Sequence, residues 1–196
     1  MLNHSTIVRH TSVALFSTLL LNAHPTAHAE PPAEPATTVS AAQPLEQPVT
    51  VELITEHTSL QPGGRTRIGI HFEMSDGWHI YAEDPGDAGL PTKITWSTSV
   101  PGVTFGPVQW PKPEEFQDPG NIRTHGYTGV LVLASPLSIW NDAAAGVMIP
   151  VRADVRWLAC KDVCIPGKAE LELMVPVTSE PPSFSAHAEF FDHINN

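Results

Sequence analysis

The chain has two cysteines, Cys160 and Cys164, with three residues between them. A pair this close can form a disulfide, exchange it with another thiol, or bind a soft metal ion through two thiolates. In the chain-entropy model a bridge that closes a loop of about five residues stabilises a fold by only about 2 kcal/mol, against about 4.7 kcal/mol for a hundred-residue loop. Three interpretations therefore remain open from the spacing: a redox pair, a structural clip and a metal site.

The cysteines lie between two segments in which apolar residues alternate with polar ones. The alternation covers residues 151–157 and again residues 169–177, and Pro166 and Gly167 mark a turn between them. A period of two is typical of strands, so the sequence predicts an antiparallel hairpin that carries the cysteines at its connection. Facing Cβ atoms in such a hairpin lie about 4.5–5.5 Å apart, close enough that the pair can be either bonded or free.

Residues 49–178 have the composition of one globular domain. Short segments rich in β-branched residues are separated in it by Pro, Gly, Asp and Asn, and none has a convincing helical period. The strands expected before the hairpin are residues 49–54, 65–74, 78–81, 92–96, 103–105, 129–133 and 147–150. About seven to nine strands with regular turn signals predict an all-β antiparallel sandwich of two sheets.

The ends of the chain have a different character. Residues 1–29 predict a secretory signal peptide, because a weakly basic start precedes an apolar run at 13–21 and an Ala-His-Ala cleavage site. That run is shorter than the roughly 20 residues that span a bilayer, so we expect export to the periplasm without membrane insertion. Residues 30–48 predict a Pro/Ala-rich flexible linker, and residues 179–196 a tail with a possible short helix.

The net charge and the absence of several motifs exclude some classes of function. The formal net charge is −11, and removal of the signal peptide, which carries Arg9 and no acidic residue, makes it −12. Such a chain is not expected to bind nucleic acid. Phosphate-binding and nucleophile motifs are missing, so no cofactor is expected. Three histidines of the domain, His71, His79 and His125, have no ligand spacing, so no metal is expected either.

The segment 110–121 predicts a long loop stiffened by prolines. It contains an aromatic residue, Phe116, among polar neighbours. Long loops without secondary structure in compact domains are often functional. Phe116 is therefore expected either to pack against the sandwich or to cover something reactive.

With these residues in view, the chain resembles the N-terminal periplasmic domain of the thiol:disulfide interchange protein DsbD and its ScsB-like relatives. The resemblance covers about residues 49–177. It rests on the motifs Gly-Trp-His-Ile-Tyr at 77–81, Pro-Glu-Glu-Phe at 113–116, His-Gly-Tyr at 125–127 and Cys-Lys-Asp-Val-Cys-Ile-Pro at 160–166.

The resemblance implies an immunoglobulin-like sandwich whose Cys160–Cys164 pair exchanges with thioredoxin-fold periplasmic proteins. The family precedent favours Cys164 as the cysteine that a partner attacks. The resemblance makes Phe116 the tip of a shielding loop. It also places Tyr81, together with either Glu114 or Glu115, near the sulfurs.

The sequence departs from the family in two ways. Its cysteine spacing is shorter than in the best-known enterobacterial form, and it holds no membrane or thioredoxin-like portion. The expected electron donor is therefore a membrane-embedded protein acting in trans, and the chain is expected to be a protein-disulfide oxidoreductase module dependent on it. Two alternatives remain: a non-catalytic sandwich that binds a partner protein and keeps a structural disulfide, and a copper-handling dithiol protein.

Overall fold

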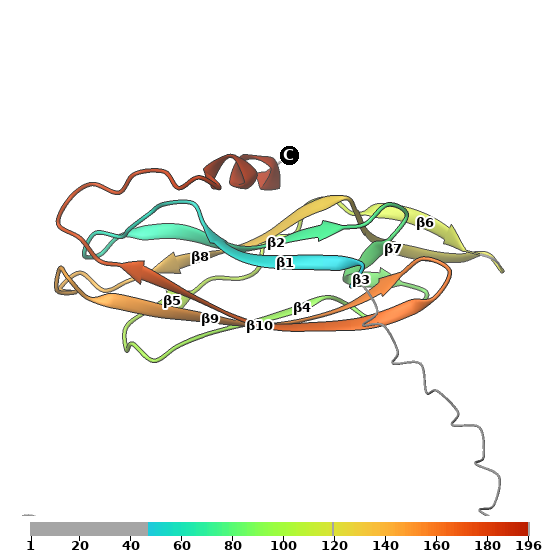
Figure 1. Ribbon diagram of the computed structural model, residues 1–196, viewed down its shortest axis with the longest axis horizontal. Coiled ribbons are helices and arrows are strands. Elements are labelled where there is room, and N and C mark those ends of the chain that lie inside the picture. Colours follow the sequence, from blue (N-terminus) through green and yellow to red (C-terminus); the bar gives the residue numbers. More distant parts are fainter. Residues whose placement is uncertain (1–46, 119, 196) are drawn as a thin grey trace, which may run out of the picture. The chain divides into compact units, whose positions relative to one another are not determined.

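The computed structural model describes residues 47–118 and 120–195. Its strands form two antiparallel sheets that face each other (Figure 1). One sheet has the order β1-β2-β8-β5, and the other has the order β10-β9-β3-β7-β6 with β4 also paired to β9. The predicted all-β sandwich is confirmed. Within the described residues no helix is long and apolar enough to cross a membrane.

The elements have the following bounds: β1 (Val49–Thr55), β2 (Arg65–Met74), β3 (His79–Gly86), β4 (Lys93–Thr98), β5 (Thr104–Phe105), β6 (Glu114–Asp118), β7 (Ile122–Thr128), β8 (Val130–Ser138), β9 (Met148–Cys160), β10 (Cys164–Pro176) and the 3₁₀ helix η1 (Ala188–Asn195).

The core lies between the sheets and follows from the alternation along the strands. In β9 every second side chain from Ile149 to Ala159 is buried, while those between them point outward. In β2 the same alternation buries Phe72, whose ring meets Trp157 of β9 edge-on at a centroid distance of 5.9 Å. Burial of these apolar surfaces holds the two sheets together.

Strand β9 is the element that positions the cysteines. Along one edge it pairs with β10 in an unbroken register from Cys164↔Cys160 to Pro176↔Met148. Along the other edge it pairs with β4 over residues 151–156 and with β3 at residues 159–160. The two segments predicted at 147–150 and 151–157 are thus one strand, paired on both sides almost throughout.

The segment 110–121 corrects one expectation, because much of it is a strand and not a loop. Strand β6 pairs with β7 from Glu114↔Gly126 to Asp118↔Ile122, which makes a hairpin at the edge of the larger sheet. Edge strands are commonly polar, and β6 has no buried face that could produce an apolar alternation in the sequence. The sequence around residues 114–118 therefore contains no pattern that predicts the pairing of β6 with β7.

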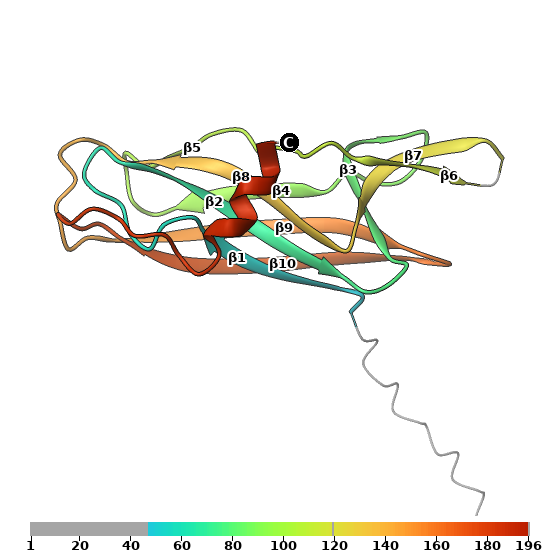
Figure 2. The same ribbon diagram turned by 90° about the horizontal axis from the view of Figure 1, so that it is seen from above.

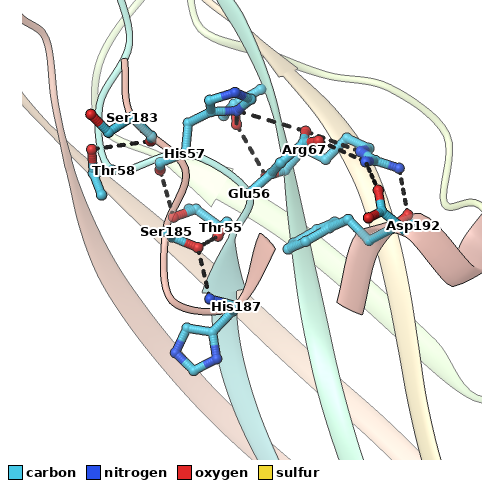
Figure 3. A network of polar contacts seen from close by, with 11 residues as sticks. Thr55, Glu56, His57, Thr58, Arg67, Ser183, Ser185, His187 and Asp192 are labelled. Atoms are coloured by element: carbon cyan, nitrogen blue, oxygen red, sulfur yellow. Dashed lines mark hydrogen bonds and ion pairs between the residues drawn. The ribbon is translucent and has the colours of Figure 1, made fainter. Parts of the chain in front are cut away.

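The C-terminal residues lie across the outer face of the smaller sheet, as Figure 2 shows for η1 over β2 and β8. Phe191 is fully buried there against Ile54, Val132 and Ala134. Arg67 of β2 donates from Nη1 to the Phe191 carbonyl oxygen at 2.6 Å. Figure 3 shows the same guanidinium bonded to Glu56, at 2.6 and 3.0 Å.

Candidate active site

The cysteines form a disulfide at the end of the β9–β10 hairpin. Their Cα atoms are 4.1 Å apart, and the three residues between them make a tight connection in which the Lys161 N–H donates to the Val163 carbonyl oxygen at 3.1 Å. Cys160 is buried, with 3% of its surface exposed, whereas Cys164 is exposed. Cys164 is therefore the more accessible cysteine of the pair.

Cys160 is buried although it lies outside the core. Ala159 points inward, so the alternation of β9 turns Cys160 to the outer face of the sheet. There the Tyr81 hydroxyl donates to the Cys160 Sγ at 3.4 Å. Gly89, at a φ of 96°, lets the β3–β4 connection pack on Tyr81, because a Cβ on Gly89 would lie 2.3 Å from that ring. The buried sulfur therefore has a fixed hydroxyl donor.

Phe116 contacts His79, the residue that pairs with Cys160. The two rings stack at a centroid distance of 4.7 Å. Gly126 of β7 lies between β6 and β3, and a Cβ there would be 3.3 Å from Phe116 Cε2 and 2.3 Å from the carbonyl oxygen of Ile80. The missing side chain of Gly126 thus lets Phe116 cross β7 and rest on His79.

The two glutamates of β6 lie on opposite faces, because strand residues alternate. Glu114 is on the face of Phe116, where its Oε1 accepts from Thr128 Oγ1 at 2.8 Å. Glu115 points the other way and forms an ion pair with Arg123 at 3.8 Å. Tyr81 contacts Cys160, and Phe116 and Glu114 lie on the same outer face of the sheet as Tyr81. Glu115 lies on the opposite face, so Glu114 is the one of the two glutamates on the side of Cys160.

Tyr127 anchors the segment that leads into β6. Burial, with the nearby Glu83 charge as a smaller cause, raises the pKa of Tyr127 to about 12. The phenol is therefore neutral at physiological pH, and its hydroxyl donates to the Pro111 carbonyl oxygen at 2.8 Å. Lys161 makes a similar anchor at the hairpin tip, because its Nζ donates to the Asp76 carbonyl oxygen at 3.1 Å.

Two residues next to the disulfide and Phe116, His79 and Gly126, were not among the site residues expected from the sequence. His79 has an unremarkable place in the sequence, and only the β3–β9 register brings it beside Cys160. Both belong to the short motifs at 77–81 and 125–127, which were the available signal. Within the described residues no group of three His, Cys, Asp or Glu side chains is placed to hold a metal ion.

The structure thus places a disulfide at the end of a hairpin of the sandwich, with Cys160 buried and Cys164 exposed, as a thiol–disulfide exchange domain requires. Residues 46–176, more than half of the chain, match the family model described as "Thiol:disulfide interchange protein DsbD, N-terminal". The chain belongs to this family, and its fold is immunoglobulin-like.

The solved structures similar to this chain include two N-terminal domains of low sequence identity. The N-terminal periplasmic domain of ScsB from Proteus mirabilis is 22% identical, with a TM-score of 0.54 over 79% of this chain and 56% of that one. This chain thus spans little more than half of the ScsB structure. The N-terminal domain of Neisseria meningitidis DsbD, in its reduced form, is 17% identical, with a TM-score of 0.33 over 67% of this chain and 89% of that one. No curated protein sequence matches the chain.

Proposed function

We propose that this protein is a periplasmic module that carries two electrons between thioredoxin-fold partners through Cys160 and Cys164. The observation that carries the proposal is the unequal environment of the two cysteines. Cys164 is exposed, and Cys160 is covered and accepts a hydrogen bond from Tyr81. One sulfur is thereby suited to be attacked and the other to leave.

The exchange proceeds in two steps. A thiolate of a reduced partner attacks Cys164 Sγ, the Cys160–Cys164 bond breaks, and the electron pair of that bond goes to Cys160 as a thiolate. The Tyr81 hydroxyl stabilises this thiolate, because hydrogen bonds to charged groups are stronger than those between neutral groups. The partner's second thiolate then attacks the mixed disulfide, releases Cys164 and leaves the partner oxidised. The reverse sequence passes the two electrons to an oxidised partner.

Phe116 acts as a cover over this chemistry. Attack on a disulfide requires approach along the S–S axis. The Phe116 ring stacks on His79, the register partner of Cys160, and from there it would slow thiols that do not displace it. A cognate protein can stabilise the displaced ring with its own contacts, whereas a small thiol cannot. The β6–β7 hairpin that carries Phe116 projects at the edge of the sheet (Figure 2) and is held at its base by Tyr127.

The location and the donor complete the proposal. The ScsB relative is described as a periplasmic domain, and export of this chain depends on the predicted signal peptide, which lies outside the described residues. The electrons come from a membrane-embedded protein acting in trans and leave to oxidised thioredoxin-fold proteins.

The decisive experiment measures the reduction potential of the Cys160–Cys164 couple and traps its partner complex. Exchange couples have potentials well above about −300 mV, and structural bridges lie below it. In Cys160→Ser the remaining Cys164 thiol should form a stable mixed disulfide with an oxidised thioredoxin-fold protein. Cys164→Ser is the matched control and should form far less of it, because Cys160 is buried.

A potential below about −300 mV together with no mixed disulfide would contradict the proposal. The pair would then be a structural bridge in a protein-binding sandwich. Equal trapping by both variants would instead contradict the assignment of Cys164 as the attacked sulfur.

A further inference from the structure

Three cations stand side by side on the outer face of the larger sheet. Lys93 of β4 pairs in register with Arg156 of β9, which pairs with Lys168 of β10. All three are exposed. Like charges directly opposite each other destabilise a sheet, so this cationic row, as we call it, works against folding.

The cationic row is only partly neutralised. Arg156 donates from Nε to Asp154 at 2.9 Å, but Lys93 and Lys168 form no ion pair with any residue in the described ranges. The chain carries 10 Lys and Arg against 21 Asp and Glu. A cluster of three cations in so acidic a protein is a local reversal of charge.

A groove of about 620 Å³ lies along the cationic row. Its apolar lining includes Leu90 and Pro91, which precede β4, and Pro166 of β10. Leu90 has 61% of its surface exposed, so its side chain is available for an apolar contact. The groove thus offers apolar contacts beside unpaired positive charge.

The groove leads to the disulfide on the same face of the sheet. From Cys164 the alternation of β10 places Pro166 and then Lys168 outward, four residues from the exposed cysteine. At about 3.3 Å per residue this is about 13 Å, the length of about four residues of an extended polypeptide. A segment bound in the groove can therefore have its own cysteine at Cys164.

We propose that the groove and the cationic row bind an acidic, extended segment of the partner protein that flanks the partner's own disulfide. This inference rests on the proposed function and adds the chemistry that selects the partner. Carboxylates of the segment neutralise Lys93, Arg156 and Lys168, and an apolar side chain covers Leu90. Charges at the rim of an interface act mainly on the association rate and on its salt dependence.

The test uses three synthetic peptides, each with an intramolecular disulfide followed by four residues that are all Glu, all Gln or all Lys. The dithiol form of the protein reduces the peptide: two electrons and two protons pass to it, and Cys160 and Cys164 close to a disulfide. Rates are measured by acid quench and mass spectrometry. At low ionic strength we expect the Glu peptide to react at least about tenfold faster than the Lys peptide, and salt should remove the difference.

The double variant Lys93→Gln/Lys168→Gln should lose this preference, so that the Glu and Lys peptides react at similar rates at low ionic strength. The control Arg65→Gln/Arg152→Gln makes the same change in net charge with cations that do not line the groove, and it should keep the preference.

The outcomes separate the inference from the proposed function. If neither the wild type nor Phe116→Ala reduces any of the three peptides, the exchange function itself is contradicted. Reduction at equal rates, or a preference that survives Lys93→Gln/Lys168→Gln, would overturn the binding site alone. A dimer that this double variant dissociates would assign the groove to a second copy of the chain and would also overturn the proposal.

Discussion

At the scale of single residues, the proposed exchange depends on the hydroxyl of Tyr81. This hydroxyl donates a hydrogen bond to the Cys160 Sγ at 3.4 Å. Gly89 packs against the Tyr81 ring, and Thr92 Oγ1 donates to the Tyr81 backbone carbonyl oxygen at 2.7 Å. A donor fixed in this way stabilises a thiolate on Cys160 without further rearrangement.

Tyr81→Phe should therefore slow reduction of the disulfide by about tenfold. A hydrogen bond to a charged group contributes about 1.5–3 kcal/mol, and about 1.4 kcal/mol corresponds to a factor of ten. In the reduced protein the same variant should raise the pKa of the Cys160 thiol, measurable by thiolate absorbance. A slower rate without a higher thiol pKa would point to a change in packing and not to the lost donor.

Phe116→Ala should accelerate reduction by small thiols such as glutathione and leave the reduction potential nearly unchanged, because a cover alters access more than the relative stability of the two redox states. Phe116 is absent from the hydrophobic core, so the free energy of unfolding should fall by only about 1 kcal/mol, the contribution of a lost ring pair. Stopped-flow reduction and a denaturant melt give the two values.

The chain offers a matched control for that variant. Phe184 stacks on His57 at 4.9 Å, in nearly the same geometry as Phe116 on His79, but on the C-terminal segment. Phe184→Ala should leave the reduction rate unchanged. An unchanged rate in Phe116→Ala with a stability loss of about 3–5 kcal/mol would instead assign Phe116 an ordinary packing role.

At the scale of elements, the β9–β10 hairpin is held by its pairing and its buried face, and the disulfide closes only its end. The register is continuous from the cysteines to Pro176↔Met148, and the inward side chains of β9 belong to the core. The disulfide is therefore free to open and close without loss of the element that carries it.

Cys160→Ser/Cys164→Ser should accordingly remain folded, with a lower melting temperature and a cooperative transition. The bridge contributes about 2 kcal/mol, against about 5–15 kcal/mol for the stability of a domain. The reduced wild type is the control, and its melting temperature should fall close to that of the variant. A double variant unfolded at room temperature would favour the structural interpretation of the disulfide.

At the scale of the whole molecule, Arg67 connects the C-terminal segment to the sandwich. Its guanidinium donates both to the Phe191 carbonyl oxygen and to the Glu56 carboxylate. The hydrogen bond from Arg67 is the largest cause of the lowered pKa of Glu56, and partial burial opposes it. A carboxyl group whose pKa is lower in the folded state stabilises the fold above its unfolded pKa, and this contribution disappears as the pH falls through the folded value.

Glu56→Gln should therefore lower the free energy of unfolding by about 2 kcal/mol at neutral pH, with the difference from wild type shrinking in acid. The control is Glu172→Gln, which breaks an exposed pair with Arg152 and should cost less than about 1 kcal/mol. Denaturant melts across the acid range give both profiles. A difference for Glu56→Gln that does not depend on pH would contradict the ionic role.

Local patterns in the sequence determined much of this molecule. The alternation over 65–74 and over the cysteine hairpin is a property of neighbouring residues, and it gave the strands, their buried faces and the sandwich. The short distance between Cys160 and Cys164 along the chain was enough to predict that they can bond. Their family motifs were enough to predict the class of chemistry.

Only the tertiary structure decided what surrounds the disulfide. The pairing of β6 with β7, the place of His79 beside Cys160 and the alignment of Lys93 with Lys168 across β9 all depend on register between strands far apart in the sequence. Register is set by which faces become buried together and not by the residues of one strand alone. For the same reason the residues next to the cysteines do not show which of the two is buried. In the folded protein Cys160 is buried and contacts Tyr81, whereas Cys164 is exposed.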